Sequence, residues 1–299
     1  VKDNGGRIGI LSGNKSKQIS KENSNNEYDF FNLSWSEVGV LRLQADTDVD
    51  YYNMDINLGY RDIGRFYPHH LEIESNQWGY EDKDHGHVGY FGFAYMNQPT
   101  QVSFTIEAQN ASNQPTKNYG LFDESLQNKI GLVAVQVDNM GNETVDLTSR
   151  LNRFPGIPNR LDCTINTDTG IYADSHWSGA ELFIEDSNFK FLKSFTNGSP
   201  CTTVPDGPYT GSNAKFGVYV SDMKDGVDFD YDSGTEIGSD SNVGVNHGLA
   251  FNTQPDFRYG RMTLDSVSGP IGGPISVPLR AEYWDGSSFI TNPDDSGSR

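Results

Sequence analysis

Residues 131–137 have the sequence Gly-Leu-Val-Ala-Val-Gln-Val, an apolar run about as long as one β-strand. Such a run predicts a strand that is buried on both faces. Residues 102–108 instead alternate between apolar and polar side chains, which predicts a half-buried strand. Further strands are expected at 181–184, 215–220 and 275–283. The core of the protein is therefore expected to consist of β-strands.

Turn-forming residues separate these runs, and helical periodicity is almost absent. The turn at Asn139-Met140-Gly141-Asn142 is typical, because Asn and Gly adopt the positive φ that tight hairpins require. Pro278 lacks a backbone N–H, so the strand expected at 275–283 should lie at a sheet edge or carry a bulge. We predict an all-β protein made of antiparallel, immunoglobulin-like β-sandwich modules in tandem.

The length of 299 residues allows two domains or three small β-modules. We predict an N-terminal β-module over residues 1–66, a central β-sandwich region over 67–255 and C-terminal strands over 256–299. The first and last of these are expected to be parts of modules that continue beyond the sequence.

Charge limits the classes of partner. The chain has 22 Lys and Arg against 41 Asp and Glu, a net charge of −19. This argues against nucleic acid or an anionic membrane as the main partner, because both require a basic face. No run of 18 apolar residues is present, so no membrane span is predicted.

The chain has two cysteines, Cys163 and Cys201. Neither lies in a Cys-x-x-Cys pair or beside paired histidines, so a zinc site is not expected. We predict that they form a disulfide in an oxidising compartment, with two separate buried thiols as the alternative.

Aspartates gather at alternate positions in two segments. Calcium takes six to eight oxygen ligands, and Asp-x-Asp-x-Asp on an extended strand points three carboxylates the same way. We therefore predict calcium as a cofactor, with solvated acidic turns as the alternative. The candidate ligands are Asp222, Asp225, Asp228, Asp230 and Asp232 in one segment, and Asp46, Asp48 and Asp50 in the other.

Two histidines suggest a second metal site, on weaker grounds than the aspartates suggest a calcium site. On a strand, His85 and His87 would face the same way beside Asp82 and Asp84, but no third firm ligand follows, which favours a polar loop. His69 and His70 come after Pro68 and are expected to begin a strand.

Three aromatic residues are candidates for sugar binding. Trp78 and Tyr80 lie in a segment expected to be a loop, and Trp177 follows a histidine. An exposed flat ring stacks on the apolar face of a pyranose. The alternative is packing in the sandwich core, where aromatic residues are common.

Catalytic signatures are missing from the sequence. The Gly-x-Ser-x-Gly turn of many hydrolases does not occur. The Gly-rich segment 269–274 contains prolines where a phosphate-binding loop needs backbone donors. We expect that the protein is not an enzyme.

Several separate segments together resemble the signature of one family, the MshQ proteins. These are large proteins encoded with the mannose-sensitive haemagglutinin pilus, a type IV pilus of aquatic bacteria. The segments are Trp35–Gly39, Ile63–Pro68, Gly92–Met96, Glu107–Asn110, Lys117–Tyr119, Phe257–Leu264, Val277–Gly286 and Phe289–Ser296.

The resemblance implies an exported, pilus-associated β-protein at the cell surface, and it brings no catalytic motif. We expect a role in adhesion, with glycan binding supported by calcium. The alternative is a structural or assembly component of the pilus without a ligand of its own. The expected partners are accordingly pilus subunits or surface glycans.

Overall fold

The computed structural model describes residues 6–16, 30–46, 54, 56–80, 92–152, 172, 176–196, 202–231, 235–238 and 243–295. Within these residues the chain is all-β, with three short 3-10 turns and no α-helix, which confirms the predicted fold class. The turns are η1 (Tyr119–Leu121), η2 (Glu124–Leu126) and η3 (Thr148–Arg150). No helix of the described residues is long and apolar enough to cross a bilayer.

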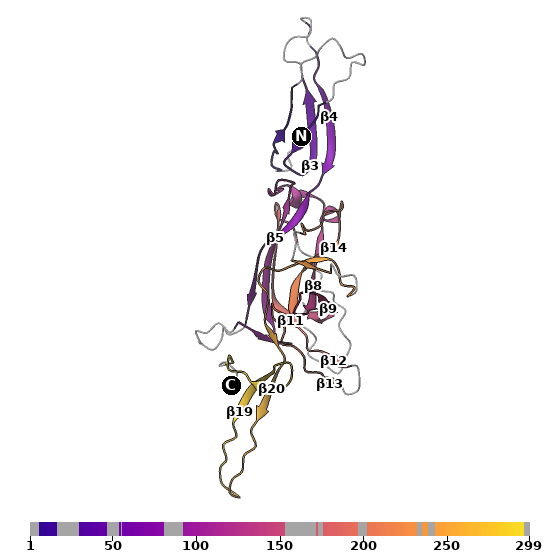
Figure 1. The fold of residues 1–299 in the computed structure, drawn as a ribbon. Helices are drawn as coiled ribbons and strands as arrows, with labels where there is room; N and C mark the ends of the chain where they lie inside the picture. The colour runs from indigo at the N-terminus through magenta and orange to yellow at the C-terminus, as the bar shows by residue number, and fades with distance from the viewer. Residues whose placement is uncertain are drawn as a thin grey trace.

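Two antiparallel sheets form the centre of the molecule (Figure 1). The first has the order β10-β11-β7-β5 and the second the order β15-β16-β14-β8-β9. The first comprises β5 (His70–Gly79), β7 (Thr100–Gln109), β10 (Leu151–Asn152) and β11 (Glu181–Phe191). The second comprises β8 (Lys129–Val137), β9 (Glu143–Asp146), β14 (Ala214–Asp222), β15 (Glu236–Ile237) and β16 (Gly248–Ala250).

Strand β8 lies within its sheet and is buried on both faces, as its sequence predicts. Leu132 and Ala134 belong to the core between the two sheets, whereas Val133 and Val135 pack on the other face with Ile237. The alternating segment 102–108 forms most of β7, and the segment expected to begin at His69–His70 becomes β5.

Aromatic rings dominate the core between the sheets. The rings of Phe191 and Phe257 stack with centroids 5.1 Å apart, and Phe216 meets Phe191 edge-on at 5.4 Å. Such arrangements add favourable ring–ring interactions to the burial of a large apolar area. Phe257 comes from the segment that leads out of the sandwich, so the core ties this segment to both sheets.

A hairpin unit lies at the N-terminal end of the molecule (Figure 1). Its long strands β3 (Gly39–Ala45) and β4 (Gly59–Phe66) pair antiparallel, with Leu41 opposite Ile63. The short strands β1 (Leu11–Ser12) and β2 (Ser34–Trp35) pair beside them.

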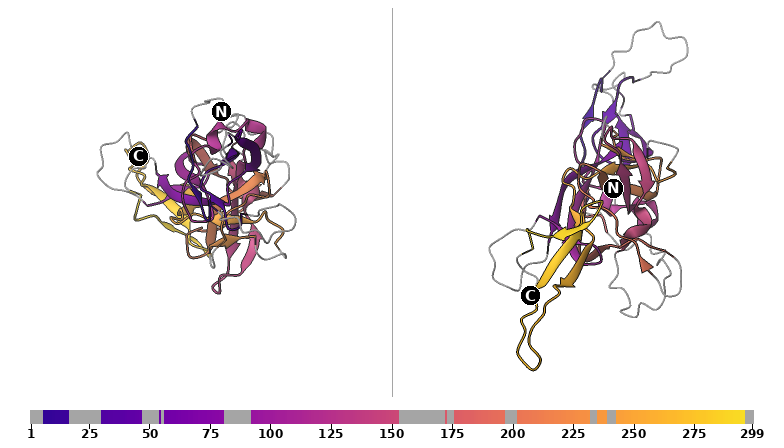
Figure 2. Two further views of the ribbon diagram at one scale, coloured as in Figure 1. Left: turned by 90° about the horizontal axis from the view of Figure 1, so that it is seen from above. Right: turned by 60° about the horizontal axis from the view of Figure 1, so that its bottom comes forward.

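A three-stranded sheet lies at the opposite end, in the order β18-β19-β20 (Figures 1 and 2). Its strands are β18 (Gly260–Leu264), β19 (Leu279–Trp284) and β20 (Phe289–Thr291). It is connected to the sandwich by the parallel pair β6 (Ala94–Tyr95) and β17 (Phe257–Arg258). The small hairpin β12 (Phe195–Thr196) and β13 (Thr202–Thr203) completes the described strands.

The strand expected at 275–283 is shorter than predicted, because β19 begins only at Leu279. Pro278 has no N–H to donate, and its carbonyl accepts a single hydrogen bond from the amide of Asp265 at 3.0 Å. The ladder to β18 therefore starts at the residue after the proline.

Candidate functional site

The parallel pair β6–β17 forms the junction between the sandwich and the C-terminal sheet. Phe257 is fully buried in the sandwich core, and the next residue, Arg258, points into the connection to the C-terminal sheet. The amide of Ala94 donates to Asp256 O at 2.9 Å, and that of Met96 donates to Arg258 O at 2.9 Å. Two backbone hydrogen bonds therefore hold β17 against β6 at the junction.

Arg258 is the central side chain of this C-terminal junction. Its guanidinium donates to Asp256 Oδ2 at 2.9 Å, to Asp294 Oδ2 at 2.7 Å and to Asn292 Oδ1 at 3.0 Å. It also lies over the ring of Phe93, at 4.2 Å from the centroid. Burial alone would lower the pKa of Arg258, but the two carboxylates outweigh burial and raise it. The charge is thus fixed in place by groups from both sides of the junction.

Tyr95 extends the same network. Its hydroxyl donates to Asp295 Oδ2 at 2.7 Å and accepts from the amide of Asn292 at 2.7 Å. Burial, and then the neighbouring Asp295, raise the pKa of Tyr95. Lys193 adds a separate tie, since its ammonium donates to Gly260 O at 2.6 Å and lies over the ring of Tyr259.

Buried polar contacts also join the N-terminal unit to the sandwich. The Glu37 side chain is buried and accepts hydrogen bonds from the amides of Lys117 at 2.6 Å and Asn118 at 2.8 Å. Burial raises the pKa of Glu37, and the backbone N–H groups partly offset this. Arg65, at the end of β4, forms an ion pair with Asp225 of the sandwich. Residues from segments far apart in the chain thus meet at this N-terminal junction.

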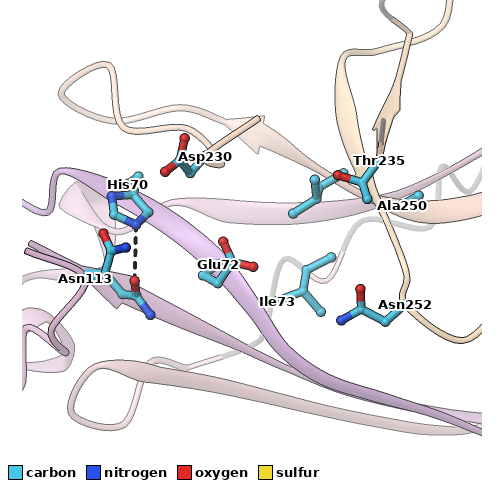
Figure 3. Close-up of a pocket in the computed structure, with 10 residues that line it drawn as sticks. His70, Glu72, Ile73, Asn113, Asp230, Thr235, Ala250 and Asn252 are labelled. Carbon is cyan, nitrogen blue, oxygen red and sulfur yellow. Dashed lines mark hydrogen bonds between the residues drawn. The ribbon is translucent and has the colours of Figure 1, made fainter. Parts of the chain in front are cut away.

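A pocket of about 350 Å³ lies beside the free edge of β5 (Figure 3). It is hollowed between β5, the segment around Asp230 and β16. Its walls carry carboxylates, amides and a histidine, and its apolar part comprises Ile73, Leu249 and Ala250. The polar lining side chains include His70, Glu72, Gln109, Asn113, Asp230 and Asn252.

Three of the candidate calcium ligands form side-chain contacts with other residues of the described chain. Asp222 pairs with Lys224 at 2.7 Å, Asp225 pairs with Arg65, and Asp228 accepts from the hydroxyl of Tyr231 at 2.8 Å. Asp230 lines the pocket, and Asp46 is exposed at the end of β3. No three possible metal ligands come together within the described residues. The calcium site therefore stays a prediction.

Two of the three candidate sugar-binding rings lie inside the protein. Trp78 belongs to β5 rather than to a loop, is only 5% exposed, and donates from Nε1 to Thr253 O at 2.9 Å. Trp177 is also 5% exposed and donates to Asn128 O at 3.1 Å. Tyr80 is half-buried, and burial raises its pKa. The two tryptophans pack in the core, which agrees with the alternative of core packing, and the sugar-binding role of the three rings stays a prediction.

The remaining candidate residues lie outside the described part of the chain. These are the calcium candidates Asp48, Asp50 and Asp232, the cysteines Cys163 and Cys201, and the histidines His85 and His87 with Asp82 and Asp84.

Sequence reasoning assigned no role to Glu37, Tyr95 or Arg258. Each lies in a segment that carries the resemblance, and that was the available signal. Arg258 also stands between two aromatic residues that are buried, which is an unusual setting for an arginine.

Two family models match the chain. Residues 37–246 match the third domain of DUF6701, and residues 258–299 match its fourth domain. The interval between the two matches ends immediately before Arg258, so the border between the family domains falls at the C-terminal junction. No curated protein and no solved structure matches the chain. The predicted domain limits at residues 66 and 255 stay predictions.

Proposed function

The chain belongs to the DUF6701 family, and we propose that it is a rigid structural piece of an exported bacterial surface protein. The resemblance to the MshQ family supports a place in, or beside, a type IV pilus. In this role the chain holds successive domains in a fixed line and spaces them along a surface structure.

The C-terminal junction carries this proposal. Flexible connections between domains are usually exposed and rich in small or polar residues. Here the connection is one strand, with Phe257 in the sandwich core and Arg258 held by Asp256 on one side and by Asn292 and Asp294 on the other. A charged side chain in a part-buried network fixes orientation, because any rotation leaves its partners unsatisfied.

The arrangement of the parts supports the same role. The N-terminal hairpin unit and the C-terminal sheet lie at opposite ends of the sandwich (Figure 1). Buried Glu37 ties the first unit to the sandwich, as Arg258 ties the second. Elongated modules with fixed joints are suited to spacing.

Adhesion is the second proposed function, and the pocket beside β5 supports it, because it offers a concave polar surface to a partner. Glycan recognition with calcium support is the form expected from the sequence. A glycan array, probed with calcium and again with a chelator, tests this form. Absence of calcium-dependent binding to any glycan would count against it.

The structural role is tested in a bacterium that carries this protein and its pilus. The chromosomal copy is replaced by the Arg258→Ala variant or by Arg42→Ala, which removes an exposed ion pair instead. If fixed spacing matters, Arg258→Ala reduces surface attachment or piliation at equal protein amounts, and Arg42→Ala does not. Wild-type attachment and piliation in both strains would contradict the proposal.

A further inference from the structure

Two neighbouring histidines bring their rings together where the chain enters the sandwich. His69 follows Pro68 in a bend, and His70 is the first residue of β5. Successive residues within a strand point to opposite faces, but the bend at His69 turns both rings to one side. Their Nδ1 atoms lie 3.0 Å apart, and the ring centroids lie 5.3 Å apart. The amide of His69 donates to Gln109 O at 2.8 Å, which holds the backbone in this position.

The separation of the two nitrogen atoms suits a shared metal ion. At a metal–nitrogen distance of about 2.0–2.1 Å, two nitrogens at a right angle around one ion lie about 2.9 Å apart, whereas a tetrahedral angle places them about 3.4 Å apart. Right-angle positions belong to the tetragonal geometry of Cu²⁺ and Ni²⁺, both of which imidazole binds well. The observed separation of 3.0 Å is close to the right-angle value.

Hydrogen bonds behind His70 prepare its Nδ1 to bind a metal. The ring is 5% exposed, and its Nε2 lies 3.1 Å from Gln109 Oε1 (Figure 3). The amide nitrogen of Gln109 donates to Glu107 at 2.9 Å and to Glu74 at 3.1 Å, so the oxygen, which only accepts, faces His70. Nε2 therefore carries the hydrogen, and Nδ1 of the neutral ring carries the lone pair. A carbonyl that accepts the second ring N–H is the usual support of a metal-bound histidine.

The surroundings admit a cation from solvent. The side chain of His69 is exposed, so one side of the pair is open to water. The two glutamates that orient Gln109 add negative charge behind His70, which favours a positive ion over an anion. Among the described residues no third histidine, cysteine or carboxylate joins the pair. Water is therefore expected to complete the coordination of the ion.

We propose that His69 and His70 bind a divalent transition-metal ion of tetragonal preference, Cu²⁺ or Ni²⁺, through their two Nδ1 atoms. In the metal-free protein, Nδ1 of His69 carries a hydrogen and donates it to Nδ1 of His70. The ion takes the place of this hydrogen, and the proton leaves to solvent. The site lies where the N-terminal hairpin unit continues into β5, and it is independent of the structural role proposed above.

The test is a titration of the full ¹⁵N-labelled chain with CuCl₂ at neutral pH, followed by NMR. The starting protein carries His85→Gln and His87→Gln, because that pair is the other candidate for a transition metal in the sequence. Paramagnetic Cu²⁺ broadens the signals of nearby amides. We expect the His70, Leu71 and Gln109 amides to broaden first, at less than one equivalent of metal. Broadening that begins elsewhere, or no broadening, would overturn the proposal.

Variants in the same background identify the ligands. His69→Ala removes one exposed ligand and is expected to weaken Cu²⁺ binding by about tenfold or more. His176→Ala is the matched control, because it removes an exposed histidine that contacts Glu124 away from the pair, and it is expected to leave binding unchanged. Thermal melts establish that each variant is folded. Equal Cu²⁺ affinity of His69→Ala and His176→Ala would refute the site.

A third variant tests the support behind His70. Gln109→Met keeps both histidines and removes the oxygen that accepts from Nε2. Loss of such a support lowers metal affinity by about 10–100-fold, and we expect a decrease in this range. If Gln109→Met is folded and binds Cu²⁺ as tightly as its parent, the ring of His70 is not held for a metal and the assignment of its Nδ1 is wrong.

Discussion

Replacing Arg258 with alanine removes the centre of the C-terminal junction. The change breaks the pairs with Asp256 and Asp294 and removes the contact with the Phe93 ring. It also leaves both carboxylates close together without their cation. The connection between the sandwich and the C-terminal sheet is therefore expected to weaken.

The size of the effect follows from burial. Breaking a fully buried ion pair costs about 3–5 kcal/mol, whereas an exposed pair contributes about 0–1 kcal/mol. The Arg258 side chain is 14% exposed, Asp256 is 22% exposed and Asp294 is 54% exposed. Arg258→Ala thus lies between the two limits, and we expect it to lower the free energy of unfolding by about 2–3 kcal/mol.

Urea denaturation followed by tryptophan fluorescence measures this effect. Arg42→Ala is the matched control, because it removes a pair with Asp62 whose side chains are 46% and 48% exposed. We expect Arg42→Ala to leave the unfolding midpoint almost unchanged. If Arg258→Ala shifts the midpoint no more than Arg42→Ala, the junction is not a stabilising network.

Three further predictions concern the fold. Burial raises the pKa of Tyr209 to about 12. The unfolded chain ionises this phenol near pH 10, so the contribution of the neutral phenol to stability is complete below pH 10 and is lost as the pH rises towards 12. Tyr209→Phe should therefore flatten the pH dependence of the urea denaturation midpoint over this range. An unchanged slope in the variant would contradict this prediction. Trp78→Ala should lower the free energy of unfolding by about 3–5 kcal/mol, because the ring lies among four phenylalanines. The control Phe183→Ala changes a 61% exposed side chain and should have little effect. Equal denaturation midpoints for the two variants would refute the packing role of Trp78. Gly217→Ala should destabilise the protein by about 1–3 kcal/mol, because a Cβ at this position would clash with the Leu249 carbonyl of the neighbouring strand. The control Gly59→Ala adds a Cβ that meets nothing within 4 Å. If thermal melts showed no effect of Gly217→Ala, β14 and β16 would be able to separate freely at this point.

Local sequence patterns predicted the strands, because the order of apolar and polar residues in a segment reflects which faces of that segment are buried. The run at 131–137 is apolar on both faces, and β8 is covered on both faces. The shortened β19 was missed for a local reason as well, since Pro278 ends the ladder that alternation alone would extend to 275.

The junctions and the pocket were not predictable in this way. Arg258 meets Asn292 and Asp294, more than thirty residues later in the chain, and Glu72 shares a pocket with Asp230. Such long-range contacts depend on which strands pair, and the alternating pattern of a strand does not determine its partner strand. Trp78 was assigned to a loop because Gly and Asp follow it, yet β5 continues through it and turns its ring into the core.

We expect the C-terminal junction to hold the sandwich and the C-terminal sheet together as one rigid body. Small-angle X-ray scattering of the chain tests it most directly. We expect wild type and Arg42→Ala to share one elongated distance distribution that matches the structure, and Arg258→Ala to give the broader distribution of a hinged molecule. A broad, hinge-like distribution already present in the wild-type protein would contradict it.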